Sequence, residues 1–203
     1  IGFAENTWPQ IIEDMNHNRL QSEYVSKPLT SGNDIVAPAY DMIDKTDYLW
    51  YNVVSTSRRC PHKCDFCYNS SSTHQYINRN IDDVLADIKQ LGTKHIMFID
   101  DNFIGNISWT KQFLERIKPL KLNWNAAVTM KIGQYPELMD LMKETGCQSL
   151  FIGFESISPQ SLSSVHKMKN NREEFERLIN ELHKRGIMVN ASFVFGLDGD
   201  TPE

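Results

Sequence analysis

From residue 48 onward, apolar strand-like runs alternate with amphipathic segments, and this alternation is the strongest constraint on how the chain folds. The runs are rich in aromatic and β-branched residues and occupy residues 48–55, 95–100, 123–128, 149–155 and 187–196. Segments with apolar residues at helical spacing separate them, at residues 81–91, 109–117, 136–146 and 172–186. Parallel strands need such right-handed helical crossovers. The sequence therefore predicts an α/β fold with five parallel strands, in an open doubly wound sheet or a barrel.

Three of the four cysteines lie directly after the first predicted strand, in the sequence RRCPHKCDFCY at residues 58–68. Three residues separate Cys60 from Cys64, and two separate Cys64 from Cys67. In parallel α/β folds, the loops at the carboxyl ends of the strands carry the chemistry. The clustering favours a metal or redox site in a reducing compartment over a secreted disulfide framework. Three thiolates on one four-iron cluster would leave one iron open to another ligand.

The residues alone leave other interpretations of this motif open. His62 or His74 could complete a zinc site, and Cys60 and Cys64 could form a disulfide. A plain iron–sulfur electron carrier would need a fourth cysteine near the cluster. The remaining cysteine, Cys147, precedes the fourth predicted strand, where we expect a small buried core residue.

The cysteine spacing, with an aromatic residue before the third cysteine and a strand before the first, resembles the motif of radical S-adenosylmethionine (radical SAM) enzymes. The resemblance runs from about residue 48 to the end. It implies a partial (β/α) TIM-like barrel truncated after the fifth strand, since the family barrel usually has six βα units. It also implies that Cys60, Cys64 and Cys67 bind a 4Fe–4S cluster whose fourth iron is chelated by S-adenosylmethionine. Reductive cleavage of that cofactor gives a 5′-deoxyadenosyl radical, which takes hydrogen from a small-molecule substrate.

The resemblance implies further cofactor contacts after the second and fourth predicted strands. Asp100, Asp101 and Asn102 match a polar motif that meets the methionyl amino group, although a solvated acidic turn would read the same way. Glu155 matches an acid that contacts the ribose or the methionine. A carboxylate that ends an apolar strand is costly without such a role. Lys167 matches a basic residue aimed at the methionyl carboxylate, and an exposed surface lysine is the alternative.

The adenine is expected to pack against the loop that carries Phe66 and the turn after the fifth strand. That strand ends in FVFGLDGDT, which resembles a glycine-bearing motif of the family and contains Gly196. Ser192 and Asn190 share one face of the strand, from which either could point into the barrel. Met130 follows the third strand, where similar proteins frequently have a polar or basic residue, so it departs from the pattern. The sequence names no catalytic residue.

Residues 1–47 differ from the rest and resemble the tail of an N-terminal cobalamin-binding domain with a linker into the barrel. Residues 48–203 would then form the radical SAM core, incomplete at its carboxyl end. We expect both ends to be cut, since the chain starts with Ile1 and its last residues, GDTPE, are typical of the opening of a helix. The cobalamin-containing branch often methylates unactivated carbon. Ring formation and methylthio transfer are the alternatives.

The composition narrows the classes of partner. A net charge of −5 provides no basic field for nucleic acid. No apolar stretch is long enough to span a bilayer, and we expect a cytoplasmic enzyme. The family resemblance implies an external electron donor of the flavodoxin or ferredoxin type.

Overall fold

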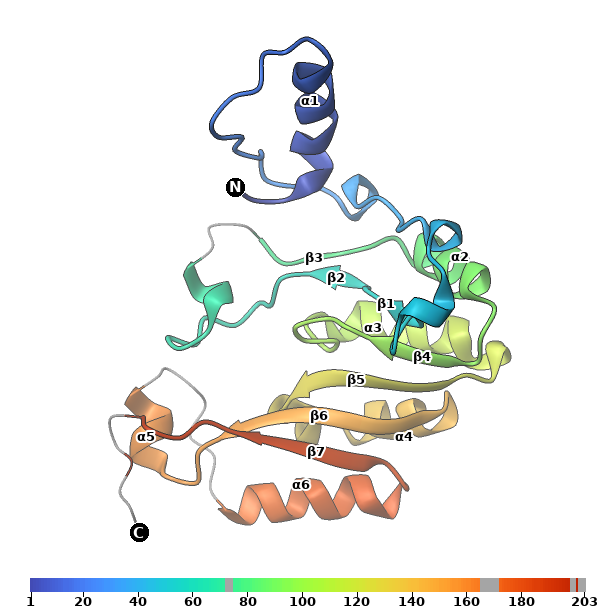
Figure 1. Ribbon diagram of the computed structural model, residues 1–203. Helices are drawn as coiled ribbons and strands as arrows, with labels where there is room; N and C mark the ends of the chain where they lie inside the picture. Colours follow the sequence, from blue (N-terminus) through green and yellow to red (C-terminus); the bar gives the residue numbers. More distant parts are fainter. Residues whose placement is uncertain (72–74, 165–171, 198–199, 201–203) are drawn as a thin grey trace.

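The computed structural model describes residues 1–71, 75–164, 172–197 and 200 (Figure 1). The described residues contain one parallel sheet of five strands, which confirms the predicted fold class. Its strands are β1 (Val53–Val54), β4 (His95–Phe98), β5 (Asn123–Thr129), β6 (Cys147–Glu155) and β7 (Met188–Phe193). Their order in the sheet is β1-β4-β5-β6-β7, which follows their order along the chain. In a doubly wound sheet the strand order changes direction at one point. In a barrel wall each strand lies next to the strand that precedes it in the chain.

The connecting helices form where the apolar periodicity predicts them. They are α2 (Ile81–Leu91), α3 (Ile107–Ile117), α4 (Pro136–Glu144) and α6 (Arg172–Lys184), whereas a further helix, α5 (Pro159–Ser164), was not predicted. The Asn80 side chain accepts a hydrogen bond from the Asp82 amide and so caps the start of α2, while Gly92 ends this helix at φ +65°. In Figure 1, α3 and α4 lie behind the sheet. Two 3-10 helices, η5 (Lys118–Leu120) and η6 (Met130–Gln134), adjoin β5 on either side.

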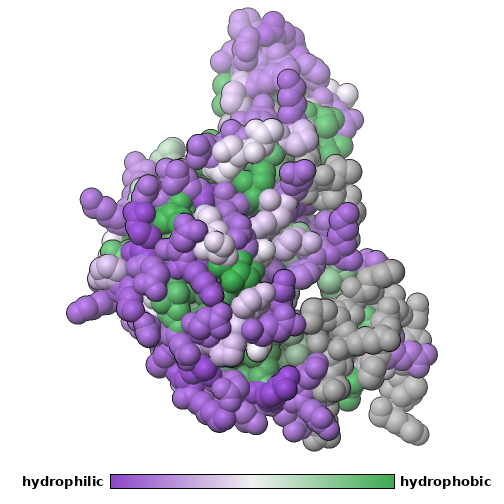
Figure 2. Space-filling view, turned by 180° about the vertical axis from the view of Figure 1, so that it is seen from behind, coloured by the Kyte–Doolittle hydropathy of each residue, from purple (hydrophilic) through white to green (hydrophobic). Residues whose placement is uncertain are grey.

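Side chains alternate between the two faces of the sheet with the period of two that strands impose. On the face toward the helices, large apolar side chains are buried together: Ile96, Phe98, Trp124, Leu150, Ile152 and Phe154. The opposite face leaves Ile99, Phe151 and Met188 between 51% and 62% exposed. Figure 2, seen from behind, shows that the helix-covered side is mostly hydrophilic at its surface. The face opposite the helices corresponds to the inside of a partial barrel, and we call it the inner face of the sheet.

The predicted first strand is much shorter than expected. Residues 48–55 contain only β1, and Tyr48, Leu49 and Trp50 are 52–88% exposed. The expectation of a buried strand over this whole run is therefore wrong. β1 lies at the edge of the sheet and pairs with β4 alone, so the sheet offers no second neighbour to extend it.

The N-terminal residues form a helix that stands apart from the helices of the barrel wall, and three short 3-10 turns, the last two of which run beside α2 (Figure 1). They are α1 (Ala4–Asn16), η1 (Gly32–Asp34), η2 (Tyr40–Met42) and η3 (Lys45–Asp47). Among the described residues, no helix has the length and apolar character needed to cross a membrane. The expected helix opening at the end of the chain falls on Thr201 to Glu203, which lie outside the described residues.

The three clustered cysteines lie between the two strands of a small antiparallel sheet. β2 (Ser57–Arg58) pairs antiparallel with β3 (Ile77–Asn78), and the 3-10 helix η4 (Tyr68–Ser71) follows the last cysteine. We call residues 59–67, between β2 and η4, the cysteine loop. This two-stranded sheet was not predicted, since each strand has only two residues and leaves no periodic pattern.

Candidate functional site

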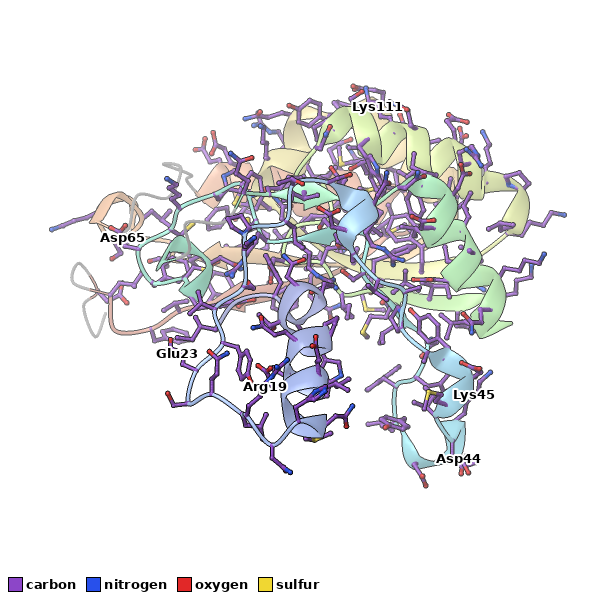
Figure 3. The ribbon with its side chains drawn as sticks, turned by 90° about the horizontal axis from the view of Figure 1, so that it is seen from above. Arg19, Glu23, Asp44, Lys45, Asp65 and Lys111 are labelled. Carbon is purple, nitrogen blue, oxygen red and sulfur yellow. The ribbon has the colours of Figure 1, made fainter. Side chains whose placement is uncertain are left out.

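The cysteine loop lies at the carboxyl ends of the parallel strands. Figure 3 shows it from above, where the labelled Asp65 marks the loop at the same end of the molecule as α5. The segments that follow β4, β6 and β7 reach this end too, and they carry the other predicted site residues (Figure 1). The fold thus brings together residues that are up to 136 positions apart, from Cys60 to Gly196. This end of a parallel sheet is where α/β enzymes bind their ligands.

The thiols of Cys60, Cys64 and Cys67 are all half-buried on the cysteine loop, and none is in a disulfide. The Cys67 amide donates a 2.9 Å hydrogen bond to the carbonyl of Cys64, which bends the loop into a tight turn. Burial raises the pKa of Cys60, and the nearby charges of Asp101, Cys64 and Cys67 raise it further. The expected core role of Cys147 is confirmed: its side chain is fully buried, and burial raises its pKa.

Within the described part of the chain, no three His, Cys, Asp or Glu side chains are grouped tightly enough to hold a single metal ion. A cubane cluster makes a different demand. It takes one thiolate on each iron, so its ligands are spread more widely than those around one ion. Three thiols on one exposed polar loop, with no fourth cysteine beside them, have the donor chemistry that such a cluster needs. The donor set therefore fits a cluster with one open iron.

Asp100 follows β4 and is 4% exposed. Its Oδ1 accepts a 2.9 Å hydrogen bond from the Thr56 amide and a 2.6 Å hydrogen bond from the Ser57 hydroxyl. Its Oδ2 has no hydrogen-bond partner among the described residues. Burial raises the pKa of Asp100 to about 6, although the bonds from Ser57 and Thr56 oppose the rise. A solvated acidic turn is thus not what the structure shows at Asp100.

The next two residues complete the acidic segment. Asp101 is exposed, and its Oδ1 accepts a 2.9 Å hydrogen bond from the Tyr68 hydroxyl, which raises the pKa of Tyr68. Asn102 is 1% exposed, and its side-chain oxygen is buried without a hydrogen-bond partner in the described part of the chain. A buried acceptor without a donor is costly, and such groups mark places where a ligand or water completes the hydrogen bonds.

Glu155 ends β6 with a backbone that few residues adopt. Its φ is +69°, in the left-handed region, and the pairing register between β6 and β7 shifts beside it. The residue is 9% exposed, so a carboxylate is held near the mouth of the barrel wall in a strained backbone. Strain of this kind costs free energy and concentrates at functional sites.

The remaining predicted site residues lie around the same mouth. Phe66 is 41% exposed on the cysteine loop, and Ser192 is half-buried and opposite Gly153 of β6. Gly196 has φ +89°, and its amide donates a 2.9 Å hydrogen bond to Asp200 Oδ2. Lys167 lies outside the described residues.

A cavity of about 360 Å³ lies on the inner face of the sheet. It begins at Asp100 and extends along the wall past three uncharged polar side chains, Asn125, Ser149 and Asn190. Apolar side chains make up most of the rest of its lining: Met97, Phe98, Ile99, Ala126, Ala127 and Phe151. The cavity is of the size and mixed polarity that small-molecule sites have.

Several contacts of this site were not predicted from the sequence. Arg79 and Asp87 form a buried ion pair of 2.6 Å, and Arg79 also donates to the carbonyl of Ser55, just before the cysteine loop. Arg58, directly before the cysteine loop, forms an ion pair of 2.9 Å with Glu5 of α1. These partners lie far apart in the sequence, and charged residues are common on surfaces, so no local pattern marks them.

All the predicted site residues fall within one family region. A family model described as the radical SAM superfamily matches residues 54–203. The chain is 28% identical over 211 residues to bacteriochlorophyllide d C-12(1)-methyltransferase of Chlorobaculum tepidum. That alignment covers 98% of this chain and 46% of the relative, so the chain spans less than half of that protein.

Two solved structures share the fold. The radical S-adenosylmethionine methyltransferase TsrM from Kitasatospora setae, solved with cobalamin and a [4Fe-4S] cluster bound, has a TM-score of 0.67 at 22% identity, covering 74% of this chain and 32% of that one. The cobalamin-dependent S-adenosylmethionine radical enzyme OxsB, solved with aqua-cobalamin bound, has a TM-score of 0.69 at 19% identity, covering 94% and 32%. At these identities the likeness establishes the fold.

Proposed function

The chain belongs to the radical SAM superfamily, and from this premise we propose that it is the core of a cobalamin-dependent enzyme that methylates carbon. The observation that carries the proposal is the position of the cysteine loop. It lies at the carboxyl end of a partial barrel, beside the acidic segment after β4, and inside the matched region. The Chlorobaculum tepidum relative aligns over nearly the whole chain and is a methyltransferase, which supports methyl transfer over ring formation or methylthio transfer.

We assign Cys60, Cys64 and Cys67 as the three ligands of a 4Fe–4S cluster. When bound, the cluster and S-adenosylmethionine supply one-electron reduction and hydrogen abstraction from carbon, and cobalamin supplies a methyl group for transfer. The side chains of this chain would bind and orient the cofactors and the substrate. The side chains that line the cavity are uncharged apart from Asp100, and the three cysteines of the cysteine loop are half-buried.

The remaining assignments concern S-adenosylmethionine. Asp100, Asp101 and Asn102 are placed to accept hydrogen bonds from an ammonium group, and two of them have a side-chain oxygen without a partner among the described residues. Glu155 is assigned to the ribose or the methionine, with its strained backbone as support. The adenine contacts are assigned to Phe66 and Gly196, and Ser192 is assigned to the cofactor without a particular group. Lys167 is assigned to the methionyl carboxylate on the family resemblance alone.

We further propose that residues 1–47 are the end of a cobalamin-binding domain with its linker, and that residues 48–203 belong to the radical SAM core. A small molecule would bind in the cavity on the inner face, whose lining carries one acid and otherwise uncharged side chains. The electron would come from a flavodoxin or a ferredoxin. We also propose a reducing compartment, the cytoplasm, because three clustered, half-buried cysteines suit a metal or redox site better than a secreted disulfide framework.

Anaerobic reconstitution with iron and sulfide tests the proposal. We expect about four irons per chain and a reduced electron paramagnetic resonance spectrum that changes when S-adenosylmethionine is added. Cys64→Ala should abolish formation of 5′-deoxyadenosine. Cys147→Ala is the matched control, since its thiol is buried in the core, and this variant should keep its iron.

Two results would count against the proposal. A spectrum that does not respond to S-adenosylmethionine would indicate that the protein is a plain iron–sulfur electron carrier. A colourless protein that binds one zinc per chain would indicate a zinc module.

A further inference from the structure

The two adjacent carboxylates after β4 contact the chain on both sides of the cysteine loop. Asp100 reaches Thr56 and Ser57, which lie before the loop, and Asp101 reaches Tyr68, the first residue after it. The cysteine loop is therefore anchored at both of its stems by one dipeptide at the end of a neighbouring strand.

The contact on the first stem is buried and short. Both hydrogen bonds go to the same oxygen, Oδ1, at 2.9 Å from the Thr56 amide and 2.6 Å from the Ser57 hydroxyl. Thr56 is fully buried and Ser57 is 4% exposed, so water does not compete for these donors. Bonds to a carboxylate are stronger than bonds between neutral groups. Asp100 thereby fixes the backbone four residues before the first cysteine.

The contact on the second stem is at the surface. The Tyr68 hydroxyl donates to Asp101 Oδ1 at 2.9 Å, and Tyr68 is 71% exposed. An exposed hydrogen bond is weaker than a buried one because water replaces it when it breaks. The first stem is therefore the stronger anchor, and the second limits how far the loop can move at its other end.

We propose that Asp100 and Asp101 are positioning residues which fix the stems of the cysteine loop, so that the three thiols are held ready for the cluster before any cofactor binds. This role rests on the proposed function only in naming the loop as the cluster loop. In this proposal the two oxygens of Asp100 have different roles. Oδ1 accepts the hydrogen bonds that hold the loop, and Oδ2 remains available to a ligand.

Amide hydrogen exchange, measured by mass spectrometry on the full chain before reconstitution, tests the anchor directly. In Asp100→Ala, we expect the Thr56 amide and the cysteine loop to exchange about tenfold faster, the factor that corresponds to about 1.4 kcal/mol of lost hydrogen bonding. Asp100→Asn keeps an oxygen that can accept both bonds, so its exchange should stay within about twofold of the wild type. Tyr68→Phe should speed exchange only in the second stem.

Asp14→Ala is the matched control, since Asp14 is also 4% exposed and hydrogen-bonded but lies in α1. It should alter exchange near residues 14–24 and leave the cysteine loop unchanged. After reconstitution, Asp100→Ala should lose iron to a chelator several-fold faster than Asp100→Asn, whereas a residue that only binds S-adenosylmethionine would give equal rates in both.

Unchanged exchange of the cysteine loop in Asp100→Ala would overturn the proposal, as would equally fast exchange in Asp100→Asn. A wild-type protein that takes up no cluster would overturn the proposed function instead, because the exchange measurements need no cofactor.

Discussion

The buried ion pair between Arg79 and Asp87 allows a sharp prediction about stability. Its nitrogen–oxygen distance is 2.6 Å, and both side chains are 2% exposed. The same Nη1 of Arg79 also donates a 3.0 Å hydrogen bond to the Ser55 carbonyl, and its Nε and Nη2 have no hydrogen-bond partner in the described part of the chain. Asp87→Asn keeps the shape of the side chain but leaves the buried guanidinium charge uncompensated.

The expected loss in the free energy of unfolding is about 3–5 kcal/mol, the usual effect of breaking a buried pair at one partner. For a chain of this size, that corresponds to a fall in the melting temperature of roughly 6–20 °C. The same helix supplies a matched control. Asp82 pairs with Arg116 at the same 2.6 Å, but the side chains are 71% and 53% exposed. Asp82→Asn should therefore cost less than about 1 kcal/mol.

Urea denaturation followed by circular dichroism measures both variants. Near-equal losses would refute the reasoning, because burial is the main difference between the two pairs. A loss below about 1 kcal/mol for Asp87→Asn would show that the Arg79 charge finds compensation elsewhere.

Three further predictions follow from the site. The pKa of Asp100 is raised from 3.8 to about 6 in the folded chain, so its contribution to stability is present below pH 3.8 and is lost as the pH rises through about 6. In urea denaturation over that pH range, the free energy of unfolding of the wild type should fall by up to about 3 kcal/mol relative to that of Asp100→Asn. A difference between the two proteins that does not change with pH would contradict this. Glu155→Gly removes the strain of φ +69° and should raise the free energy of unfolding by about 1 kcal/mol while weakening S-adenosylmethionine binding in calorimetry; a less stable variant would mean that the carboxylate contacts outweigh the strain. Glu5→Gln breaks the part-buried pair with Arg58 and should cost about 1 kcal/mol, with no loss expected if the pair is only a surface contact.

Sequence periodicity predicted the parts of the fold whose signals are local. The helix over residues 172–186 was found as α6, with its apolar residues Phe175, Leu178 and Leu182 in the core. The cap at Asn80 and the stop at Gly92 were found because their chemistry lies within one turn of the helix. The alternation of strands and helices predicted five parallel strands, but it left the sheet order open between a doubly wound sheet and a barrel.

The errors came where the structure depends on neighbours that a local pattern does not contain. Residues 48–50 are aromatic and apolar, yet they are exposed at the edge of the sheet, where no second strand pairs with them. The site residues were named by resemblance to a family, but their contacts were not. The partners of Asp100 lie 43 and 44 residues away. Hydrogen bonds over such separations are set by the fold as a whole, and one sequence carries no direct sign of them.

Because the strands stand in the sheet in the order in which they occur along the chain, the fold can assemble as it is synthesised. Each new strand, as it leaves the ribosome at about 5–20 residues per second, meets an edge that the preceding βα unit has already built. The cysteine loop comes from the first of these units, but its anchor Asp100 arrives only with the next strand. The thiols are thus translated before the residues that fix their stems, and during that interval the loop is at its most open to oxidation.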